Sequence, residues 1–153
     1  MPQSTIEVIA RGVWWWRDQL LVCRNLKHGY SYLPGGHVEF GESCADALRR
    51  EFQEEAGIVP EVGAMLAVIE LRFNQRGRER HEVSTVFHVK HGPIDDAQPP
   101  SIRSLESKIA FDWVPTLSLA QERFEPSVIL PWLQQRHLPS APMLLSFDQR
   151  SSE

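Results

Sequence analysis

The sequence predicts an α+β fold in which a mixed β-sheet packs against helices. The hydrophobic patterns run along the chain in the order strands, helix, strands, helix. The chain has 153 residues, of which 42% are hydrophobic and 24% charged, as is usual for one globular domain with its own core. We therefore expect a single domain over residues 1–153, with its core in about residues 5–136 and a tail at 137–153.

The first part of the chain predicts a β-hairpin. Residues 6–16 are rich in β-branched and aromatic residues and residues 20–24 are apolar, so we expect two strands joined by a turn at residues 17–19. A polar loop is expected at residues 25–32, and the Pro-Gly-Gly run at residues 34–36 is expected to interrupt regular structure.

Residues 43–56 predict an amphipathic helix. Ser43 is a suitable N-cap and Asp46 follows three residues later, as in a capping box. Gly57 suits the position after the last helical residue. The apolar side chains recur every four residues and form the face expected to be buried: Cys44, Leu48, Phe52 and Ala56.

The second part predicts three strands and a helix. Strands are expected at residues 62–73, 82–89 and 108–114, with a basic hairpin loop at residues 74–81. A loop is expected at 91–104, and a helix at 126–135 with Pro126 near its first turn. We expect the last few residues of the tail to be disordered.

Charge and composition exclude several classes of protein. The net charge of −4 argues against a stable nucleic-acid partner, which requires a basic surface. No apolar run is long enough to span a membrane. The first five residues lack the features of a signal peptide, and Cys23 and Cys44 have no metal-ligand spacing, so we expect a cytoplasmic protein with reduced thiols.

Three carboxylates gather at the end of the predicted helix. Glu51, Glu54 and Glu55 fall within an arc of roughly 100°. The pair Glu51 and Glu55 costs about 0.2–0.5 kcal/mol on a free helix, and the helix dipole adds to the repulsion. A solvated acidic face is the simplest explanation of such a run. The alternative is a hard cation such as Mg²⁺ or Mn²⁺, which prefers oxygen ligands and can bridge an acidic protein to an acidic ligand.

The segment before the helix favours the interpretation that the carboxylates bind a cation. Residues 35–42 read Gly-Gly-His-Val-Glu-Phe-Gly-Glu, and glycines allow a backbone to approach a ligand closely. No Gly-Lys-Ser/Thr sequence follows, so the segment is not a P-loop.

Read together, the segment and the helix resemble the Nudix box: Gly, five residues, Glu, seven residues, then Arg-Glu-hydrophobic-any-Glu-Glu-any-Gly-hydrophobic. Every fixed position is filled, although Phe52 is aromatic where aliphatic residues are commoner. The positions that match are Gly36, Glu42, Arg50, Glu51, Phe52, Glu54, Glu55, Gly57 and Ile58. Residues 20–22 and 113–115 also resemble segments that flank the box in that family.

The resemblance to Nudix hydrolases implies an α/β/α sandwich and Mg²⁺- or Mn²⁺-dependent hydrolysis of a phosphoanhydride bond in a nucleoside diphosphate linked to another group. It implies that the metal ligands are the carbonyl of Gly35 and the carboxylates of Glu51, Glu54 and Glu55. Arg50 resembles an orienting residue that pairs with Glu39 or Glu42. The general base is expected to be Glu54 or Glu106, so that these two, with Arg50, Glu51 and Glu55, form the expected catalytic set.

The sequence says less about the substrate. Arg11, Arg24 and Arg72 are expected to bind phosphates through the guanidinium group, Gly36 to contact the substrate, and Phe73 to stack on a base. Other arginines at 76, 78 and 80 and aromatic residues at 14–16, 30 and 32 are further candidates. A nucleoside triphosphate and a nucleotide sugar both stay open.

Two other functions are compatible with the same fold. A nucleotide-binding module without hydrolysis is the main alternative, although such a module has no need of convergent carboxylates. An isomerase of prenyl diphosphates is the second, but the sequence lacks a Cys-Ser-His-Pro segment. A homodimer is possible, with exposed tryptophans of the first strand as its contact.

Overall fold

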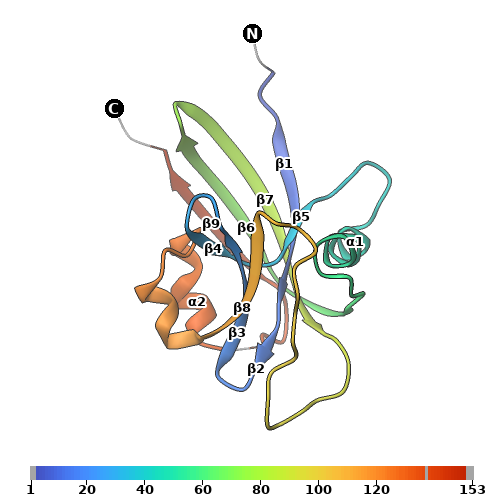
Figure 1. Cartoon of the computed structure of the whole chain (residues 1–153). Helices are drawn as coiled ribbons and strands as arrows, with labels where there is room; N and C mark the ends of the chain where they lie inside the picture. The colour runs from blue at the N-terminus through green and yellow to red at the C-terminus, as the bar shows by residue number, and fades with distance from the viewer. Residues whose placement is uncertain (1–2, 137, 151–153) are drawn as a thin grey trace.

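The structure is a computed structural model, and it describes residues 3–136 and 138–150 (Figure 1). A five-stranded sheet has the order β5 (Gly35–His37), β1 (Ile6–Val13), β7 (Arg78–Lys90), β6 (Glu61–Gln75) and β9 (Met143–Gln149). A smaller sheet contains β2 (Trp15–Trp16), β3 (Gln19–Asn25) and β4 (Tyr30–Tyr32), and β8 (Ile109–Pro115) pairs with β3. The helices are α1 (Cys44–Ala56) and α2 (Leu130–Gln134), and the 3₁₀ turns are η1 (Thr116–Gln121) and η2 (Ser127–Ile129).

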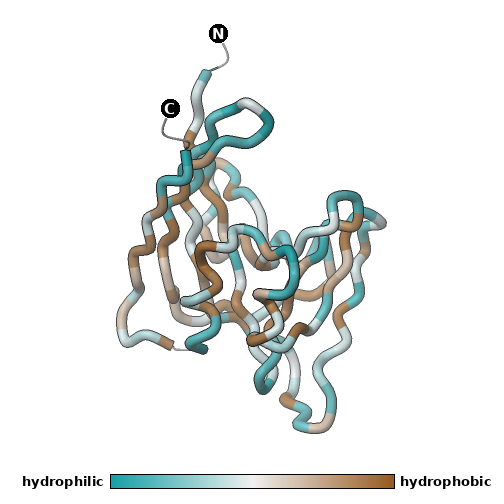
Figure 2. Tube along the Cα trace, turned by 90° about the vertical axis from the view of Figure 1, so that its left-hand side faces the viewer, coloured by the Kyte–Doolittle hydropathy of each residue, from teal (hydrophilic) through white to brown (hydrophobic). Residues whose placement is uncertain are grey.

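The expected mixed sheet between helices is confirmed. Strand β1 runs parallel to β7 and β6 runs parallel to β9, whereas β5–β1 and β6–β7 are antiparallel. Helices α1 and α2 lie on opposite sides of the strands (Figure 1). Each side has its own buried cluster: Leu48 and Phe52 of α1 pack with Ala10 and Val89, and Trp132 and Leu133 of α2 belong to the other cluster. Hydrophobic residues follow the strands, and the loops are mainly hydrophilic (Figure 2).

The predicted helix is confirmed together with both of its ends. The Ser43 hydroxyl accepts a hydrogen bond from the backbone N–H of Asp46 at 3.0 Å. Gly57 adopts a left-handed conformation with φ 69°, and its N–H donates to the carbonyl of Gln53. Leu48 and Phe52 are completely buried, whereas Cys44 is only half-buried. These contacts fix the direction in which Glu51 and Glu55, which lie beside the buried face of α1, point.

The predicted first strand is divided in the structure. The chain leaves the larger sheet after Val13 and enters the smaller one at Trp15, so that only β2 and β3 form the expected hairpin. Trp14 between them is buried edge-on against Trp113, with ring centroids 5.4 Å apart. The predicted strand therefore contributes to two sheets, which strand propensity alone cannot reveal.

Several predicted loops form strands instead. Most of residues 74–81 belong to β6 and β7, which meet at a two-residue turn, Arg76–Gly77, where both residues have positive φ. The Gly-Gly run forms β5, and part of the predicted 25–32 loop forms β4. In these cases backbone pairing with a neighbouring strand outweighs local turn propensity.

The end of the chain also differs from expectation. The region after residue 137, expected to be a tail, contributes β9, whose residues 143–149 pair with residues 67–73 of β6. The predicted helix at 126–135 is instead the 3₁₀ turn η2 followed by the short α2. The residues expected to be disordered, 151–153, lie outside the described residues. No helix within the described residues is long and apolar enough to cross a membrane.

Candidate active site

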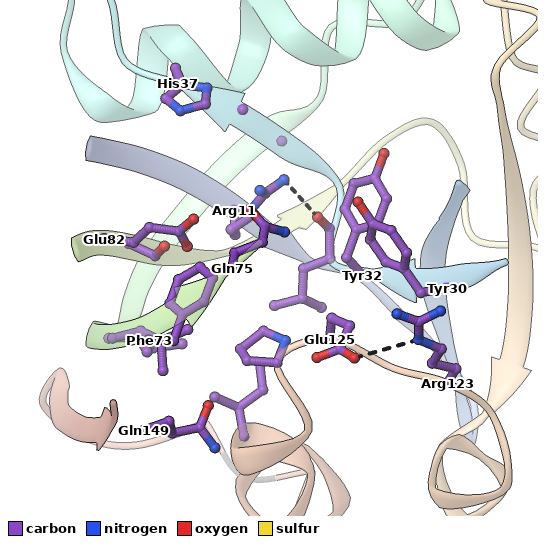
Figure 3. A pocket seen from close by; sticks show the side chains of 18 of the residues that line it. Arg11, Tyr30, Tyr32, His37, Phe73, Gln75, Glu82, Arg123, Glu125 and Gln149 are labelled. Atoms are coloured by element: carbon purple, nitrogen blue, oxygen red, sulfur yellow. Dashed lines mark hydrogen bonds and ion pairs between the residues drawn. The ribbon is translucent and has the colours of Figure 1, made fainter. Parts of the chain in front are cut away.

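A pocket of about 600 Å³ opens beside the acidic side of α1 (Figure 3). Its walls come from the sheet strands β1, β6 and β7, from the glycine strand β5, from α1 and β4, and from the segment 123–129. The pocket thus brings together parts of the chain that are more than 100 residues apart in sequence.

The two glycines of β5 let the backbone lie against both a strand and the helix. Gly35 has φ 138°, and a Cβ atom there would lie 2.0 Å from the carbonyl oxygen of Ala10. A Cβ atom on Gly36 would lie 2.5 Å from the carboxyl carbon of Glu51. Any side chain at position 36 would therefore displace Glu51, so glycine is required here for steric reasons.

Glu51 and Glu55 share one wall of the pocket. Burial, as the largest cause, and the negative charges of Glu51 and Glu106 together raise the pKa of Glu55 to about 8, against the opposing effect of Arg11. Two carboxyl groups that share a half-buried position cannot both ionise cheaply. A proton or a cation bound between these two side chains would therefore relieve their repulsion.

Glu54 has a different environment from its two neighbours. Its side chain is 55% exposed, lies 3.4 Å from the guanidinium of Arg50, and does not line the pocket. Within residues 3–136 and 138–150, no group of three or more His, Cys, Asp or Glu side chains is arranged to hold a metal ion. Glu51 and Glu55 therefore lie together on the pocket wall and Glu54 lies outside it, while Nη1 of Arg50 pairs with both Glu51 and Glu54.

Arg50 joins the loop before α1 to the helix itself. Its Nε and Nη2 donate to the two carboxylate oxygens of Glu42 at 3.1 and 2.8 Å, and Nη2 also donates to the carbonyl of His37 at 2.9 Å. Its Nη1 donates to Glu51 at 3.0 Å. The hydrogen bonds from Arg50 lower the pKa of Glu42. Of the two predicted partners, Glu42 forms this bidentate pair, while Glu39 lies 3.8 Å from Nη1.

The loop that carries Glu106 is attached to the end of α1. The backbone N–H of Leu105 donates to the carbonyl of Glu55 at 2.7 Å. The hydroxyl of Ser104 accepts from the N–H of Glu106 at 3.0 Å and shapes the loop. The charge of Glu106 contributes to the raised pKa of Glu55, and Glu106 itself does not line the pocket.

The predicted substrate residues divide into two groups. Arg11, Gly36 and Phe73 line the pocket, whereas Arg24 and Arg72 do not. The guanidinium of Arg24 is occupied by Glu122 at 2.9 Å and Asp112 at 3.1 Å. Arg72 projects from the opposite face of β6 from Phe73 and donates to Ser146 of β9. Arg24 is thus neutralised by acidic residues, and Arg72 lies on the face of its strand that points away from the pocket. Both outcomes depend on the strand register.

Other residues of the pocket were not assigned a role from the sequence. They are polar or aromatic and come from several elements: Gln75, Glu82, Arg123, Glu125 and Gln149, with Tyr30 and Tyr32, which the sequence offered only as general candidates. Arg123 and Glu125 reach the pocket because backbone bonds hold residues 123–125 to Ser31. No local sequence signal marks this long-range contact.

A family model described as the NUDIX domain matches residues 7–133. The chain belongs to the Nudix family. The box that suggested this membership is the glycine strand, the loop and helix α1, and in the structure it forms one wall of the pocket.

Relatives of this Nudix domain include an ADP-ribose pyrophosphatase from Methanocaldococcus jannaschii, which is 37% identical over 52% of this chain and 50% of that protein. An 8-oxo-dGDP phosphatase from Mus musculus is 28% identical over 67% of this chain and 30% of that protein. The Nudix chain thus spans half or less of the length of these curated relatives. Among solved structures, a MutT protein from Methanosarcina mazei superposes with a TM-score of 0.67 at 20% identity, covering 88% of this chain and 95% of that one, which shows the shared fold.

Proposed function

We propose that this protein hydrolyses a phosphoanhydride bond in a nucleoside diphosphate linked to a further group, by attack of water on phosphorus with Mg²⁺ or Mn²⁺ bound. The observation that carries the proposal is the meeting of Glu51 and Glu55 on the wall of a pocket that also contains Arg11 and aromatic rings. The relatives from M. jannaschii and M. musculus, named for action on ADP-ribose and 8-oxo-dGDP, support this substrate class.

The donor set fits a hard divalent cation. Glu51 and Glu55 supply carboxylate oxygens, and Gly35, whose carbonyl we propose as a third ligand, also lines the pocket. The mutual repulsion of the two carboxylates is the expected state of such a site before a cation binds. A bound Mg²⁺ or Mn²⁺ supplies positive charge to the phosphates and lowers the pKa of bound water.

Arg11 is placed to hold a phosphate of the substrate. Its Nη1 donates to the carbonyl of Leu33 at 3.1 Å, and the guanidinium lies 5.4 Å from the ring centre of Tyr32. These contacts restrict the side chain and leave its other N–H groups for the ligand. Arg11 lines the same pocket as Glu51 and Glu55, and its charge opposes the rise in the pKa of Glu55.

Glu106 is the better of the two candidates for the residue that orients or deprotonates the attacking water. Its loop is bonded to the end of α1, and its charge acts directly on Glu55. Neither Glu54 nor Glu106 lines the pocket, but Glu54 is paired with Arg50. A carboxylate that approaches the metal ligands from outside the helix can act on water bound beside them.

The experiment is a screen of nucleoside diphosphates, triphosphates and nucleotide sugars for release of phosphate, pyrophosphate or nucleoside monophosphate. We expect turnover with Mg²⁺ or Mn²⁺ and none with EDTA. Glu51→Gln and Glu55→Gln should each lower kcat at least 100-fold, because each removes a metal ligand. Glu61→Gln is the matched control, since Glu61 is exposed, lies outside the pocket and pairs with Lys90 at 3.4 Å.

The same screen separates the enzyme from a binding module. Nucleotide binding without turnover under every metal condition would contradict the proposal and favour the module. Full turnover by both glutamine variants would show that the reaction takes place elsewhere.

A further inference from the structure

Glu82 presents a carboxyl group to the pocket without a hydrogen-bond partner among the described residues. The side chain is 21% exposed, and the nearest cationic nitrogen, Nη2 of Arg80, is 3.9 Å away. The neighbouring Glu7 takes the closer contacts instead: Arg80 donates to it at 2.6–2.8 Å, and His37 lies at 2.9 Å. Burial raises the pKa of Glu82, and Arg11 offsets this only in part. A ligand that donates hydrogen bonds to Glu82 would therefore bind more tightly, because it would supply the partner that this carboxyl group lacks in the free protein.

The strand register places Glu82 beside an aromatic ring. Leu71 lies opposite Glu82 across β6 and β7, and Phe73 is the next residue of β6 on the same face. Diagonal neighbours of this kind are about 7–8 Å apart, within reach of long side chains. Phe73 and Glu82 occupy the same end of the pocket in Figure 3. A flat ring stacked on Phe73 would consequently turn its edge towards Glu82.

Gln75 supplies the complementary donor at this end of the pocket. Its amide oxygen accepts a hydrogen bond from Nη1 of Arg80 at 2.8 Å, which leaves the amide NH₂ group for a ligand. The end near Phe73 therefore offers a carboxylate acceptor and an amide donor around one aromatic ring.

We infer that this end of the pocket binds the base of the nucleotide and that Glu82 selects a guanine-type base. Guanine carries two neighbouring donors, N1–H and N2–H₂, next to the acceptor O6, which matches a carboxylate next to an amide donor. Hypoxanthine lacks the N2 amine, and adenine presents an acceptor at N1. The inference rests on the proposed function, because it assigns the base of the same substrate.

Binding without metal tests the inference separately from hydrolysis. GDP, IDP and ADP are titrated into the protein in EDTA at pH 8, where hydrogen bonding to the ligand favours the ionised form of Glu82. We expect GDP to bind roughly tenfold more tightly than IDP, because one hydrogen bond to a charged group changes affinity by about this factor. ADP should bind more weakly still. Glu82→Gln should reduce the GDP:IDP affinity ratio to about one, because the amide keeps one acceptor and loses the other.

Glu125→Gln is the matched carboxylate variant in another part of the pocket, apart from Glu82 in Figure 3, where Glu125 lies 3.7 Å from Arg123. It should leave the GDP:IDP ratio unchanged. Equal affinity of the wild-type protein for the three nucleotides would overturn the inference without any variant. A ratio that responds to Glu125→Gln and not to Glu82→Gln would place the base in that other part of the pocket and also overturn it. Selective GDP binding without metal-dependent turnover of any nucleotide would instead contradict the proposed function and leave the base site standing.

Discussion

The carboxyl groups of Glu51 and Glu55 lie on the same wall of the pocket, and the pKa of Glu55 rises to about 8. Burial is the main cause, and the charge of Glu51 adds to it. One helical turn thus places two acids where only one can ionise readily near neutral pH. This pair determines how the free protein should respond to pH and to metal ions.

The stability of the metal-free protein should fall as pH rises from about 5 to 8. Because the pKa of Glu55 is about 8 in the folded protein and 4.5 when unperturbed, the folded state holds a proton that the unfolded state has lost over this interval. Thermal unfolding in EDTA should show a decrease of several degrees in Tm. Glu55→Gln should flatten that dependence, whereas a slope unchanged by the substitution would mean that Glu55 is not the group responsible.

Gly36→Ala should inactivate the enzyme while leaving the fold intact. The new methyl group would lie 2.5 Å from the carboxyl carbon of Glu51 and push that side chain from its position. Near-UV circular dichroism checks the fold, and kcat with the best substrate checks activity. In a Glu51→Gln background the glycine substitution should add little further loss, since both changes remove the same interaction. Fully additive losses would contradict this reading.

Arg50→Lys should loosen the loop before α1. Lysine keeps the charge but cannot donate simultaneously to both oxygens of Glu42 and to the carbonyl of His37. We expect a loss of about 1–3 kcal/mol in the free energy of unfolding and faster proteolysis within residues 37–43. Arg49→Lys is the control, because Arg49 is half-buried on the same helix and pairs with Asp46 at 2.8 Å. Equal effects of the two substitutions would show that the Arg50 contacts are not important for stability.

Glu106→Gln should lower kcat more than Glu54→Gln, with little change in KM for either. Glu106 acts on Glu55 from a loop bonded to the helix end, whereas Glu54 is held by Arg50. The pH dependence of kcat provides a second readout, because loss of a general base removes the acidic limb of the profile. The reverse order of the two effects would assign the base to Glu54.

The helix and its acidic wall could be predicted because their signals are local. Ser43, Gly57 and the apolar repeat that contains Leu48 and Phe52 determine where α1 begins, ends and packs. Those same contacts orient Glu51 and Glu55 towards the pocket. Sequence periodicity could not show that Arg50 would pair with Glu54, since any of several carboxylates lies within reach of one arginine.

The rest of the pocket depends on contacts between distant segments. Ser31 of β4 binds the backbone of residues 123–125, which brings Arg123 and Glu125 to the site from nearly 100 residues away. Gln149 reaches Phe73 only because β9 pairs with β6. Arg24 was expected to bind substrate, but Asp112 and Glu122 neutralise it. Such pairings depend on strand order and register, which a single sequence does not specify.

Calorimetric titration of the protein with Mn²⁺, in the presence of a non-hydrolysable nucleoside diphosphate analogue, tests most directly whether Glu51 and Glu55 hold a metal ion against the substrate. We predict saturable binding for the wild-type protein and for Glu61→Gln, and at least tenfold weaker binding for Glu51→Gln and Glu55→Gln. Undiminished Mn²⁺ affinity in both of the latter variants would contradict the account.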